Sequence, residues 1–370
     1  MKKICILQNS MTFGGTDTFV INLCKGLVCD GYDVTVVLSA DADENLPREK
    51  ELASTGARIT KTCHPRKILS KSRHLNLLYK ELKKEKYDVF QTNIDLFNGV
   101  NLFVAWLAGV PVRECHSHNS EQSKELKYGK TLPVIIYQKL MRWMCWTFSN
   151  RRGGCSRLAM RFLFEDEWKN DPYSKVVHNG IELSAFDTVF DIEKKKEELG
   201  LTNKKNLCTV GRISHQKNPL FLVEILNDLF KTRDDCDFVW MGTGKLEDKV
   251  KTKLHEYGIE DRVHLIGART DVSEVLRCCD LFLLPSLFEG LAIVLVEAQA
   301  ARLSCLVSDK TPSEANSGGC QYLPIDKGTS VWVDSINKSL DGGLLLPIDS
   351  DKLNEYSIDY MVKEMEDLFE

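Results

Sequence analysis

The sequence predicts an α/β protein of two domains, each built on a parallel sheet crossed by helices. Short runs rich in Ile, Val and Leu alternate with amphipathic stretches from end to end, a pattern typical of parallel sheets. The chain has 370 residues, too many for one ordinary core. The alternation also forms two series of similar size, with a boundary near the polar stretch after Asn179-Gly180.

Each short apolar run bounded by turn residues is expected to form a strand, and the stretches between these runs are expected to form helices. The strands expected in the first series are Lys3–Gln8, Asp33–Ser39, Ala57–Thr60, Asp88–Thr92, Val110–Cys115 and Lys175–His178. Those expected in the second are Leu207–Val210, Phe238–Met241, Val263–Ile266, Leu281–Leu284 and Leu303–Val307. Expected helices include Thr16–Val28, Leu69–Lys86, Pro219–Lys231, Leu246–Tyr257 and Tyr356–Glu370.

Composition and charge are those of a soluble globular enzyme. Hydrophobic residues make up 43% of the chain and charged residues 28%. A net charge of −4 gives no support to nucleic acid as a partner. No apolar run reaches the roughly 18 residues of a membrane span, and the chain starts directly in a predicted strand, so no span or signal peptide is expected. The 13 cysteines lack zinc-ligand spacing, which favours a reducing cytosol and no metal site.

The most informative stretch is Leu281–Ala301, where an apolar run ends in a loop and a helical pattern follows. Glu289 lies in the loop and Glu297 on the helix. Eight residues on one helix turn through about 80° beyond two full circles, so two acids at this spacing would not share a face. With Glu289 in the loop and Glu297 about two turns along the helix, both can face one crevice. The free N–H groups of residues 290–293 would lie between them, which predicts a ligand with hydroxyls on either side of an anion.

Two cations, Arg212 and Lys217, lie in a loop that follows another predicted strand and ends where a helix starts at Pro219. Arg212 can present a planar fork of donors to phosphate oxygens, and Lys217 can add a mobile positive charge. Two solvated surface cations are the alternative. The position of the loop at the carboxyl end of a strand, in the same sheet as Leu281–Leu284, favours an anion site.

Two glycine motifs also follow predicted strands. Gly14-Gly15 predicts a phosphate or sugar contact, with an ordinary glycine turn as the alternative. Gly242 and Gly244 resemble the start of a nucleotide-binding loop, but Glu247 stands where a dinucleotide fingerprint needs glycine. The second motif therefore indicates only that some group approaches the backbone there.

His116 and His118 follow a further strand end, two residues apart. Such a pair can ligate a metal, but no third ligand lies at a useful spacing. We therefore expect a polar wall to a cleft, with one imidazole hydrogen-bonding a hydroxyl or a phosphate.

The segment 121–157 differs from the rest of the chain. It holds eight Lys and Arg residues against Glu121 and Glu125, a net charge of +6, with Tyr, Trp and Phe residues interleaved. A basic, aromatic helix of this kind can lie on an anionic membrane surface. A domain helix with a solvated basic face is the alternative, and the sequence does not choose between the two.

The order and spacing of these motifs resemble glycosyltransferase family 4, the retaining nucleotide-sugar transferases, over essentially the whole chain. The stretch from Glu289 to Glu297 fits the E-x7-E motif of that family, and Gly211–Pro219 fits its diphosphate loop. Matches at family-typical places in the N-terminal half are Gly14-Gly15, the His116–His118 loop, Gly154–Ser156 and His178–Ile181. The resemblance implies the GT-B fold, in which two Rossmann-like domains face a central cleft.

The resemblance also implies how the domains divide. The C-terminal helix of the family crosses back onto the first domain. We therefore expect an acceptor-side domain of residues 1–182 plus 355–370 and a nucleotide-sugar-binding domain of residues 183–354. The family needs no cofactor and no metal, because protein cations do the electrostatic work that a metal does in other transferases.

The residue roles of the family carry over to the matching positions. Arg212 and Lys217 would bind the donor diphosphate and stabilise the leaving nucleoside diphosphate. Glu297 would accept hydrogen bonds from the ribose hydroxyls, and Glu289 would hold hydroxyls of the donor sugar. His118, as a catalytic residue, or His116 would reach the sugar from the other domain. The other expected substrate contacts are Gly14, Gly15, Gly244, Gly290, Leu291, Ala292 and Ile293.

Two positions depart from the pattern of the family. Ala292 stands where proline is frequent, which changes the stiffness of the loop but removes no functional side chain. Asp17 stands where glutamate is common, so any acceptor contact that it makes would be about one methylene shorter. Neither change argues against activity.

The sequence thus predicts a cytosolic, metal-independent, retaining glycosyltransferase similar to bacterial capsular and exopolysaccharide enzymes. A UDP-sugar would donate to a hydroxyl of a glycan or lipid-linked glycan, and the enzyme would be free in the cytosol or peripheral at the inner face of the membrane. The alternatives are a sugar-nucleotide epimerase of the same fold, a non-catalytic subunit of a polysaccharide assembly complex, and a dinucleotide-dependent oxidoreductase.

Overall fold

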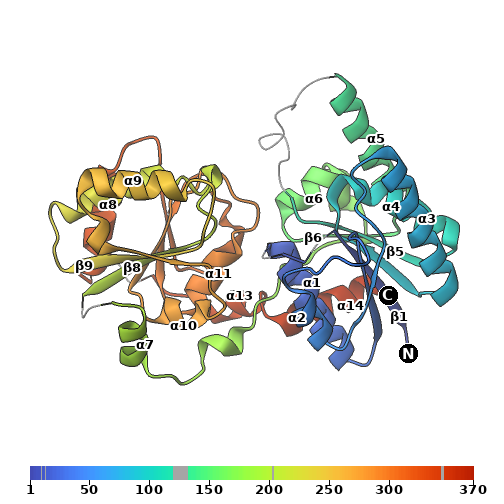
Figure 1. The fold of residues 1–370 in the computed structure, drawn as a ribbon, viewed down its shortest axis with the longest axis horizontal. Helices are drawn as coiled ribbons and strands as arrows, with labels where there is room; N and C mark the ends of the chain where they lie inside the picture. The colour runs from blue at the N-terminus through green and yellow to red at the C-terminus, as the bar shows by residue number, and fades with distance from the viewer. Residues whose placement is uncertain (10, 13, 120–131, 202–203, 343–345) are drawn as a thin grey trace. The chain divides into compact units, whose positions relative to one another are not determined.

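The computed structural model describes residues 1–9, 11–12, 14–119, 132–201, 204–342 and 346–370 (Figure 1). The chain divides into two compact units, Met1–Ile181 with Glu355–Glu370 and Glu182–Asn354. Each unit has its own parallel sheet and its own buried apolar core. The predicted fold class, two α/β domains with parallel sheets, is confirmed.

The first unit contains a seven-stranded sheet in the order β3-β2-β1-β4-β5-β6-β7, and all its strand pairs are parallel. Its strands are β1 (Lys3–Gln8), β2 (Asp33–Leu38), β3 (Arg58–Lys61), β4 (Val89–Thr92), β5 (Val112–Ser117), β6 (Arg151–Gly154) and β7 (Ser174–Val176). Its helices are α1 (Gly15–Cys29), α2 (Glu49–Ser54), α3 (Ile68–Glu85), α4 (Asn98–Ala108), α5 (Leu132–Phe148), α6 (Arg157–Phe164) and α14 (Ile358–Phe369), with 3₁₀ turns at Asp95–Phe97 and Glu167–Asn170.

The second unit contains a six-stranded parallel sheet in the order β10-β9-β8-β11-β12-β13. Its strands are β8 (Lys205–Val210), β9 (Cys236–Met241), β10 (Val263–Gly267), β11 (Leu281–Leu284), β12 (Ser304–Ser308) and β13 (Cys320–Leu323). Its helices are α7 (Ile192–Glu198), α8 (Pro219–Phe230), α9 (Glu247–Tyr257), α10 (Val272–Arg277), α11 (Ile293–Ala300), α12 (Ser330–Leu340) and α13 (Ser350–Asn354). The 3₁₀ turns are Leu183–Phe186, His215–Lys217, Glu260–Arg262 and Ser313–Ala315.

Two strands of the structure, β6 and β13, were not predicted from the sequence. β6 is made of two arginines and two glycines, so it contains no apolar run, yet it lies between β5 and β7 and most of it is buried. β13 is short and lies at the edge of its sheet, with Gln321 and Tyr322 only partly buried. The position of β6 also corrects the basic segment, because its helix α5 ends at Phe148 and Arg151 onwards belongs to the sheet. Residues 121–131 of that segment lie outside the described part of the chain.

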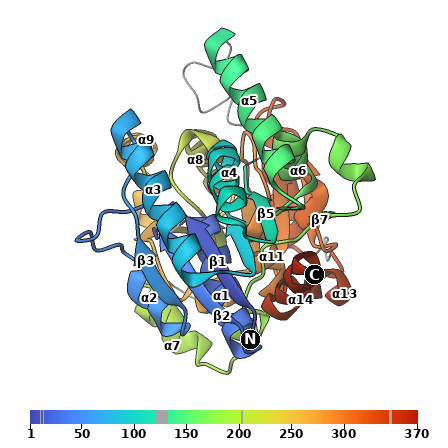
Figure 2. The same ribbon diagram turned by 90° about the vertical axis from the view of Figure 1, so that its right-hand side faces the viewer.

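The C-terminal helix α14 belongs to the first unit and packs against α1 (Figures 1 and 2). Ile181, the last residue of the first segment of this unit, pairs with Ser357 in a parallel bridge. The bridge therefore joins the two chain segments that make up the unit. The contact between the helices is close at Gly26, where an added Cβ would lie 2.2 Å from Cγ2 of Val362. Only a residue without a side chain allows α1 and α14 to approach this closely.

The structure contains no helix, among the residues it describes, that is both long enough and apolar enough to span a membrane. All 13 cysteines are free thiols, and most of them are buried in the two sheets and the helices around them.

We predict that Gly26→Ala lowers the free energy of unfolding by about 1–3 kcal/mol, because the new methyl group overlaps Val362. Shortening the opposing side chain should relieve the overlap, so Val362→Ala should cost less in the Gly26→Ala background than in the wild type. Urea unfolding of the two single variants and the double variant measures this coupling. Strictly additive losses would contradict the close contact.

Candidate functional site

The candidate site of the second unit lies where the strand order of its sheet reverses. β8 and β11 are adjacent in the middle of the sheet, with Leu281 opposite Leu207. From β8 the chain continues outwards to β9 and β10 on one side, and from β11 to β12 and β13 on the other. The loops after β8 and β11 therefore leave the sheet side by side at its carboxyl edge, which is where open α/β sheets bind ligands.

The loop after β8 is packed against the loop after β9. Gly242 has φ +137°, and a Cβ on it would lie 2.1 Å from the backbone oxygen of Gly211. A Cβ on Gly244 would lie 2.3 Å from the oxygen of Ile213, and the N–H of Ile213 donates to the oxygen of Thr243. The sequence indicated that some group approaches the backbone at Gly244. In the structure that group is the protein's own loop.

Lys217 and Glu289 meet across the two central loops. Nζ of Lys217 lies 2.8 Å from Oε1 of Glu289, and the two side chains are 18% and 6% exposed. Oγ of Ser286 donates to Oε1 of Glu289 at 2.6 Å, and Nε2 of Gln216 donates to Oε2 at 3.2 Å. The N–H of Leu287 donates to the oxygen of Gln216, which ties the two loops together. The almost buried carboxyl of Glu289 is thus held by three donors, from Lys217, Ser286 and Gln216.

Helix α11 begins later than expected. Ala292 is its N-cap and Ile293 its first residue, so Glu297 lies little more than one turn along the helix rather than two. Gly290 and Leu291 precede the helix, and their N–H groups have no hydrogen-bond acceptor within the described residues. The N–H of Ile293 donates to the oxygen of Leu291. The N–H of Ala292 likewise has no acceptor within the described residues, so three of the four expected backbone donors are available to a ligand.

Glu297 is partly buried and makes no hydrogen bond or ion pair with the residues that the structure describes. Burial raises the pKa of its carboxyl from 4.5 to about 7, while the positive charge of Lys217 acts in the opposite direction. That influence places Glu297 near the Lys217–Glu289 pair. A carboxyl group set into the protein without a partner is rare, because a folded chain gains by pairing it.

Arg212 is exposed, and within the described part of the chain it has no acidic partner. Its neighbour Gly211 lies against Lys217, whose Cε would be 2.8 Å from a Cβ at that position. One unpaired guanidinium and one ammonium therefore start from the same loop. This arrangement suits an anionic ligand such as a diphosphate.

In the first unit, the loop after β1 is held by Asp17. Its Oδ2 accepts hydrogen bonds from the N–H and Oγ1 of Thr12, at 2.9 and 2.8 Å, and from the N–H of Gly14 at 3.3 Å. Its Oδ1 accepts from Nε2 of Gln8 at 2.6 Å, and the residue is 3% exposed. Asp17 therefore organises the Gly14-Gly15 turn from inside. A direct acceptor contact by its carboxylate would require these bonds to break.

The two histidines after β5 differ sharply in access. His116 is fully buried, shares a 3.0 Å hydrogen bond between its Nδ1 and Oε1 of Glu114, and stacks on Phe19. Burial lowers the pKa of His116 to about 3, so the ring is neutral. His116 would have to leave this buried position to touch a sugar, so its predicted contact stays a prediction. His118 is partly exposed, and its Nε2 is 2.9 Å from Oδ1 of Asn93.

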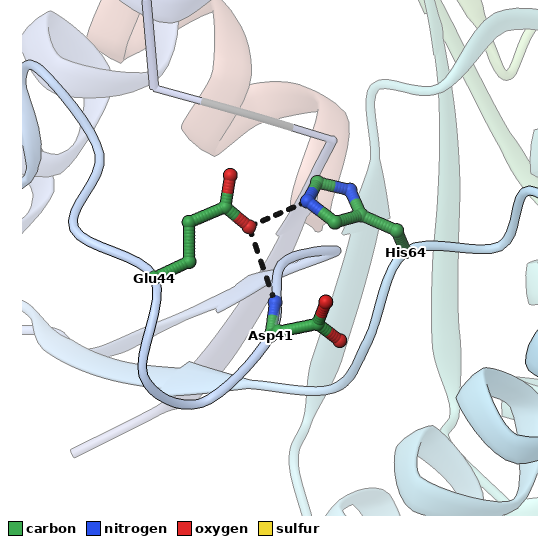
Figure 3. Close-up of side chains that lie close together, drawn as sticks. All are labelled: Asp41, Glu44 and His64. Carbon is green, nitrogen blue, oxygen red and sulfur yellow. Dashed lines mark hydrogen bonds and ion pairs between the residues drawn. The ribbon is translucent and has the colours of Figure 1, made fainter.

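A further cluster of possible metal ligands lies at the surface of the first unit (Figure 3). Asp41, Glu44 and His64 have ligand atoms within 4.8 Å of one another. Nε2 of His64 is 2.5 Å from Oε2 of Glu44, and this hydrogen bond lowers the pKa of the Glu44 carboxyl. The pair satisfies itself and Asp41 is exposed. The cluster is therefore accounted for as a surface hydrogen bond that joins the loops after β2 and β3.

The structure thus brings together Lys217, Glu289, Glu297 and the amides before α11, with Arg212 on the same loop as Lys217. Sequence reasoning missed Gln216 and Ser286, which hold Glu289, and Asn93, which holds His118. Each lies within three residues of a predicted site residue or at a predicted strand end. No pattern of spacing distinguishes them from ordinary polar loop residues.

Two family models match the chain in succession. The model described as Glycosyltransferase Family 4 matches residues 13–185. The model described as Glycosyl transferases group 1 matches residues 191–318. The second match contains Arg212, Lys217, Glu289 and Glu297.

Two curated proteins with glycosyltransferase names are similar to this chain. The putative glycosyltransferase EpsF of Bacillus subtilis is 26% identical over 351 residues, covering 92% of this chain and 88% of EpsF. An Escherichia coli enzyme, UDP-Gal:alpha-D-GlcNAc-diphosphoundecaprenol alpha-1,3-galactosyltransferase, is 31% identical over 258 residues, covering 67% of this chain and 64% of the enzyme.

Among solved structures, HepE of Anabaena in complex with UDP matches with a TM-score of 0.81 at 15% identity, covering 99% of each chain. At that identity the likeness establishes the fold. The resemblance in fold extends over both units of the chain.

We predict that Lys217→Ala lowers the free energy of unfolding by about 2–4 kcal/mol, because it leaves the carboxylate of Glu289 nearly buried without its cation. The double variant Lys217→Ala, Glu289→Gln should be more stable than Lys217→Ala alone, since glutamine keeps the polar contacts and carries no charge. Urea unfolding measures all three chains. If the double variant is the least stable, the ion pair is not the cause.

Glu297 should make stability depend on pH. Its folded pKa of about 7 lies above the usual 4.5, so its contribution is fully present below about pH 4.5 and is lost as pH rises through 7. We predict that Glu297→Gln removes this loss, so that the variant gains up to about 3 kcal/mol relative to the wild type between pH 5 and pH 8. Urea unfolding at unit steps of pH tests this. Parallel pH curves for the two proteins would contradict the raised pKa.

Proposed function

The chain belongs to glycosyltransferase family 4 and has the GT-B fold, and we propose that it transfers a sugar from a UDP-sugar, with retention of configuration, to a hydroxyl of a glycan or lipid-linked glycan in cell-surface polysaccharide synthesis. The observation that carries the proposal is the joining of Lys217 and Glu289 at the carboxyl ends of β8 and β11, with Glu297 beside them. These groups offer a cation for a diphosphate and carboxylates for hydroxyls.

The diphosphate would lie between the cations and the loop before α11. Arg212 and Lys217 supply positive charge from one side, and the N–H groups of Gly290 and Leu291 supply donors from the other. Lys217 is already held against Glu289, so little side-chain entropy would be lost when the anion binds. Leu291, Ala292 and Ile293 would contribute backbone, since the side chain of Ala292 is 3% exposed.

The two carboxylates would bind hydroxyl groups at opposite ends of the donor. Glu289 has its oxygens oriented by Ser286 and Gln216, which fixes the directions in which it can accept from the sugar. Glu297 has no partner within the described residues and is free to accept two ribose hydroxyls. Such hydrogen bonds favour the ionised form and would lower its raised pKa on binding.

The first unit would contribute the acceptor side. His118 is the histidine of this loop with access to solvent, and Gly14-Gly15 leave the backbone uncovered at the start of α1, where nothing lies within 4 Å of a Cβ added at Gly15. In this conformation Nε2 of His118 is taken by Asn93 and its Nδ1 is buried. Contact with a sugar would therefore require the imidazole to exchange its bond to Asn93 for one to the substrate.

The reaction would proceed by displacement on the front face of the donor. The bond from the anomeric carbon to the diphosphate oxygen breaks as the acceptor oxygen approaches from the same side, and the acceptor proton passes to the leaving diphosphate. Arg212 and Lys217 stabilise the charge that develops on that diphosphate. Glu289 is occupied by Lys217, Ser286 and Gln216, which suits a hydrogen-bonding role better than that of a covalent nucleophile.

Lipid-linked acceptors enter the proposal through the Escherichia coli relative, whose name gives a diphosphoundecaprenol-linked sugar as the acceptor. UDP as the nucleotide is supported by that enzyme's donor and by the UDP complex of HepE.

The experiment that tests the function is a panel of UDP-sugars incubated with a diphosphoundecaprenol-linked sugar acceptor. We expect one donor to release UDP in the presence of the acceptor and to yield a product with the anomeric configuration of the donor. Conversion of a UDP-sugar without any acceptor would instead identify a sugar-nucleotide epimerase. A chain that binds no UDP-sugar would be a non-catalytic subunit, and a melting shift with NADH but not UDP would indicate an oxidoreductase.

We predict that Arg212→Ala reduces transfer by about tenfold to a thousandfold while the melting temperature stays within about 2 °C, because the side chain is exposed and pairs with no described acid. Lys249→Ala is the matched control, since Lys249 is an exposed cation of the same unit on α9. Turnover and thermal melting are measured on both variants. Equal turnover in the two variants would remove Arg212 from the donor site.

A further inference from the structure

Helix α5 carries a second apolar face that no described residue covers. Leu132, Ile136, Leu140 and Trp143 are spaced four, four and three residues apart, which places them on one side of the helix. Their exposed fractions are 69%, 57%, 48% and 57%. We call these four residues the α5 stripe.

The opposite side of α5 already makes the contact with the protein. Met141 and Cys145 are its buried residues, and both belong to the core formed with α4 and the sheet. A surface helix of a globular protein normally needs one apolar face, which it turns to the core. The α5 stripe is therefore not explained by packing against the described residues of this domain.

The exposed apolar surface is wider than one stripe. Ile135 and Tyr137 flank it and are 37% and 43% exposed. The first turns of α5 also extend beyond the other helices of the first unit (Figures 1 and 2). An interfacial helix buries its apolar face at the boundary between headgroups and acyl chains, and a broad face of this kind suits that position.

The charge around the stripe has one sign. From Leu132 to Phe164 the chain has no Asp or Glu and six basic residues: Lys139, Arg142, Arg151, Arg152, Arg157 and Arg161. Arg142 and Arg161 reach the acids that follow, Glu165 and Asp166, and Arg152 reaches Asp171. Lys139 is exposed beside the stripe and has no acidic partner within the described residues. This charge is complementary to anionic lipid headgroups.

We propose that the α5 stripe inserts into the headgroup and upper acyl region of an anionic lipid bilayer and anchors the first unit there. Trp143 and Tyr137 are side chains that favour that interface, because each has an apolar ring and a polar group. The proposal decides between the two interpretations of the basic, aromatic segment that the sequence left open. It does not depend on the proposed glycosyl transfer.

The test is flotation of the full chain with vesicles of phosphatidylcholine and phosphatidylglycerol, compared with vesicles of phosphatidylcholine alone. We expect the wild type to bind the anionic vesicles, and Ile136→Ser with Leu140→Ser to lower binding by about tenfold or more. Ile68→Ser with Leu69→Ser is the matched control, because these two residues are 83% and 85% exposed on α3 of the same unit. The control should bind as the wild type does, and Lys139→Glu should weaken binding to the anionic vesicles alone.

Melting temperature and urea unfolding show whether the stripe variant is folded, and with a folded variant the outcomes are decisive. The proposal would be overturned if the wild type bound the anionic vesicles no better than the stripe variant does. Equal binding by the stripe variant and the control variant would also overturn it. So would a wild type that prefers neither vesicle. Light scattering measures the oligomeric state of both proteins. If the wild type is a dimer that binds no vesicles and the stripe variant is a monomer, the stripe is an interface between copies of the chain and the proposal is overturned.

Discussion

The adjacency of β8 and β11 is the constraint on which the second unit depends. Because the strand order reverses between them, the two loops that leave their carboxyl ends are not separated by another strand. Lys217 can therefore reach Glu289 across 72 residues of sequence with a 2.8 Å contact. That contact, with the donors from Ser286 and Gln216, sets the conformation of both loops and so the positions of Arg212 and the amides before α11.

The same reversal occurs in the first unit, between β1 and β4, but its polar groups are used differently. Asp17 accepts hydrogen bonds from the turn after β1, and Asn93, directly after β4, is bonded to His118 and to the backbone of Leu7. Asp17 and Asn93 are therefore each engaged in hydrogen bonds within the first unit. The second unit instead presents an exposed cation, Arg212, and a carboxyl, Glu297, that has no partner among the described residues.

The fold was predictable because it depends on patterns that the sequence displays. Alternating apolar runs specify parallel strands, and most predicted strands agree with the structure to within two residues. β6 was not predictable in this way, because Arg151 and Arg152 keep their backbone in the sheet while their charged ends find Tyr173 and Asp171. The spacing of Glu289 and Glu297 likewise located the site but not its contacts. The ion pair with Lys217, and the burial that separates His116 from His118, depend on neighbours distant in sequence.

The unpaired groups of the second unit indicate that it is organised for a ligand. A folded chain gains free energy by pairing its buried polar groups. Glu297 instead keeps a carboxyl whose pKa is raised by burial, close enough to Lys217 to feel its charge but without a hydrogen bond to any described residue. Lys217 is committed to Glu289, so it does not neutralise Glu297 fully. A ligand that brings hydroxyl donors to Glu297 and negative charge to Arg212 satisfies both groups at once. A direct ion pair between Arg212 and Glu297 would also satisfy them, but it would fill the space that the ligand needs.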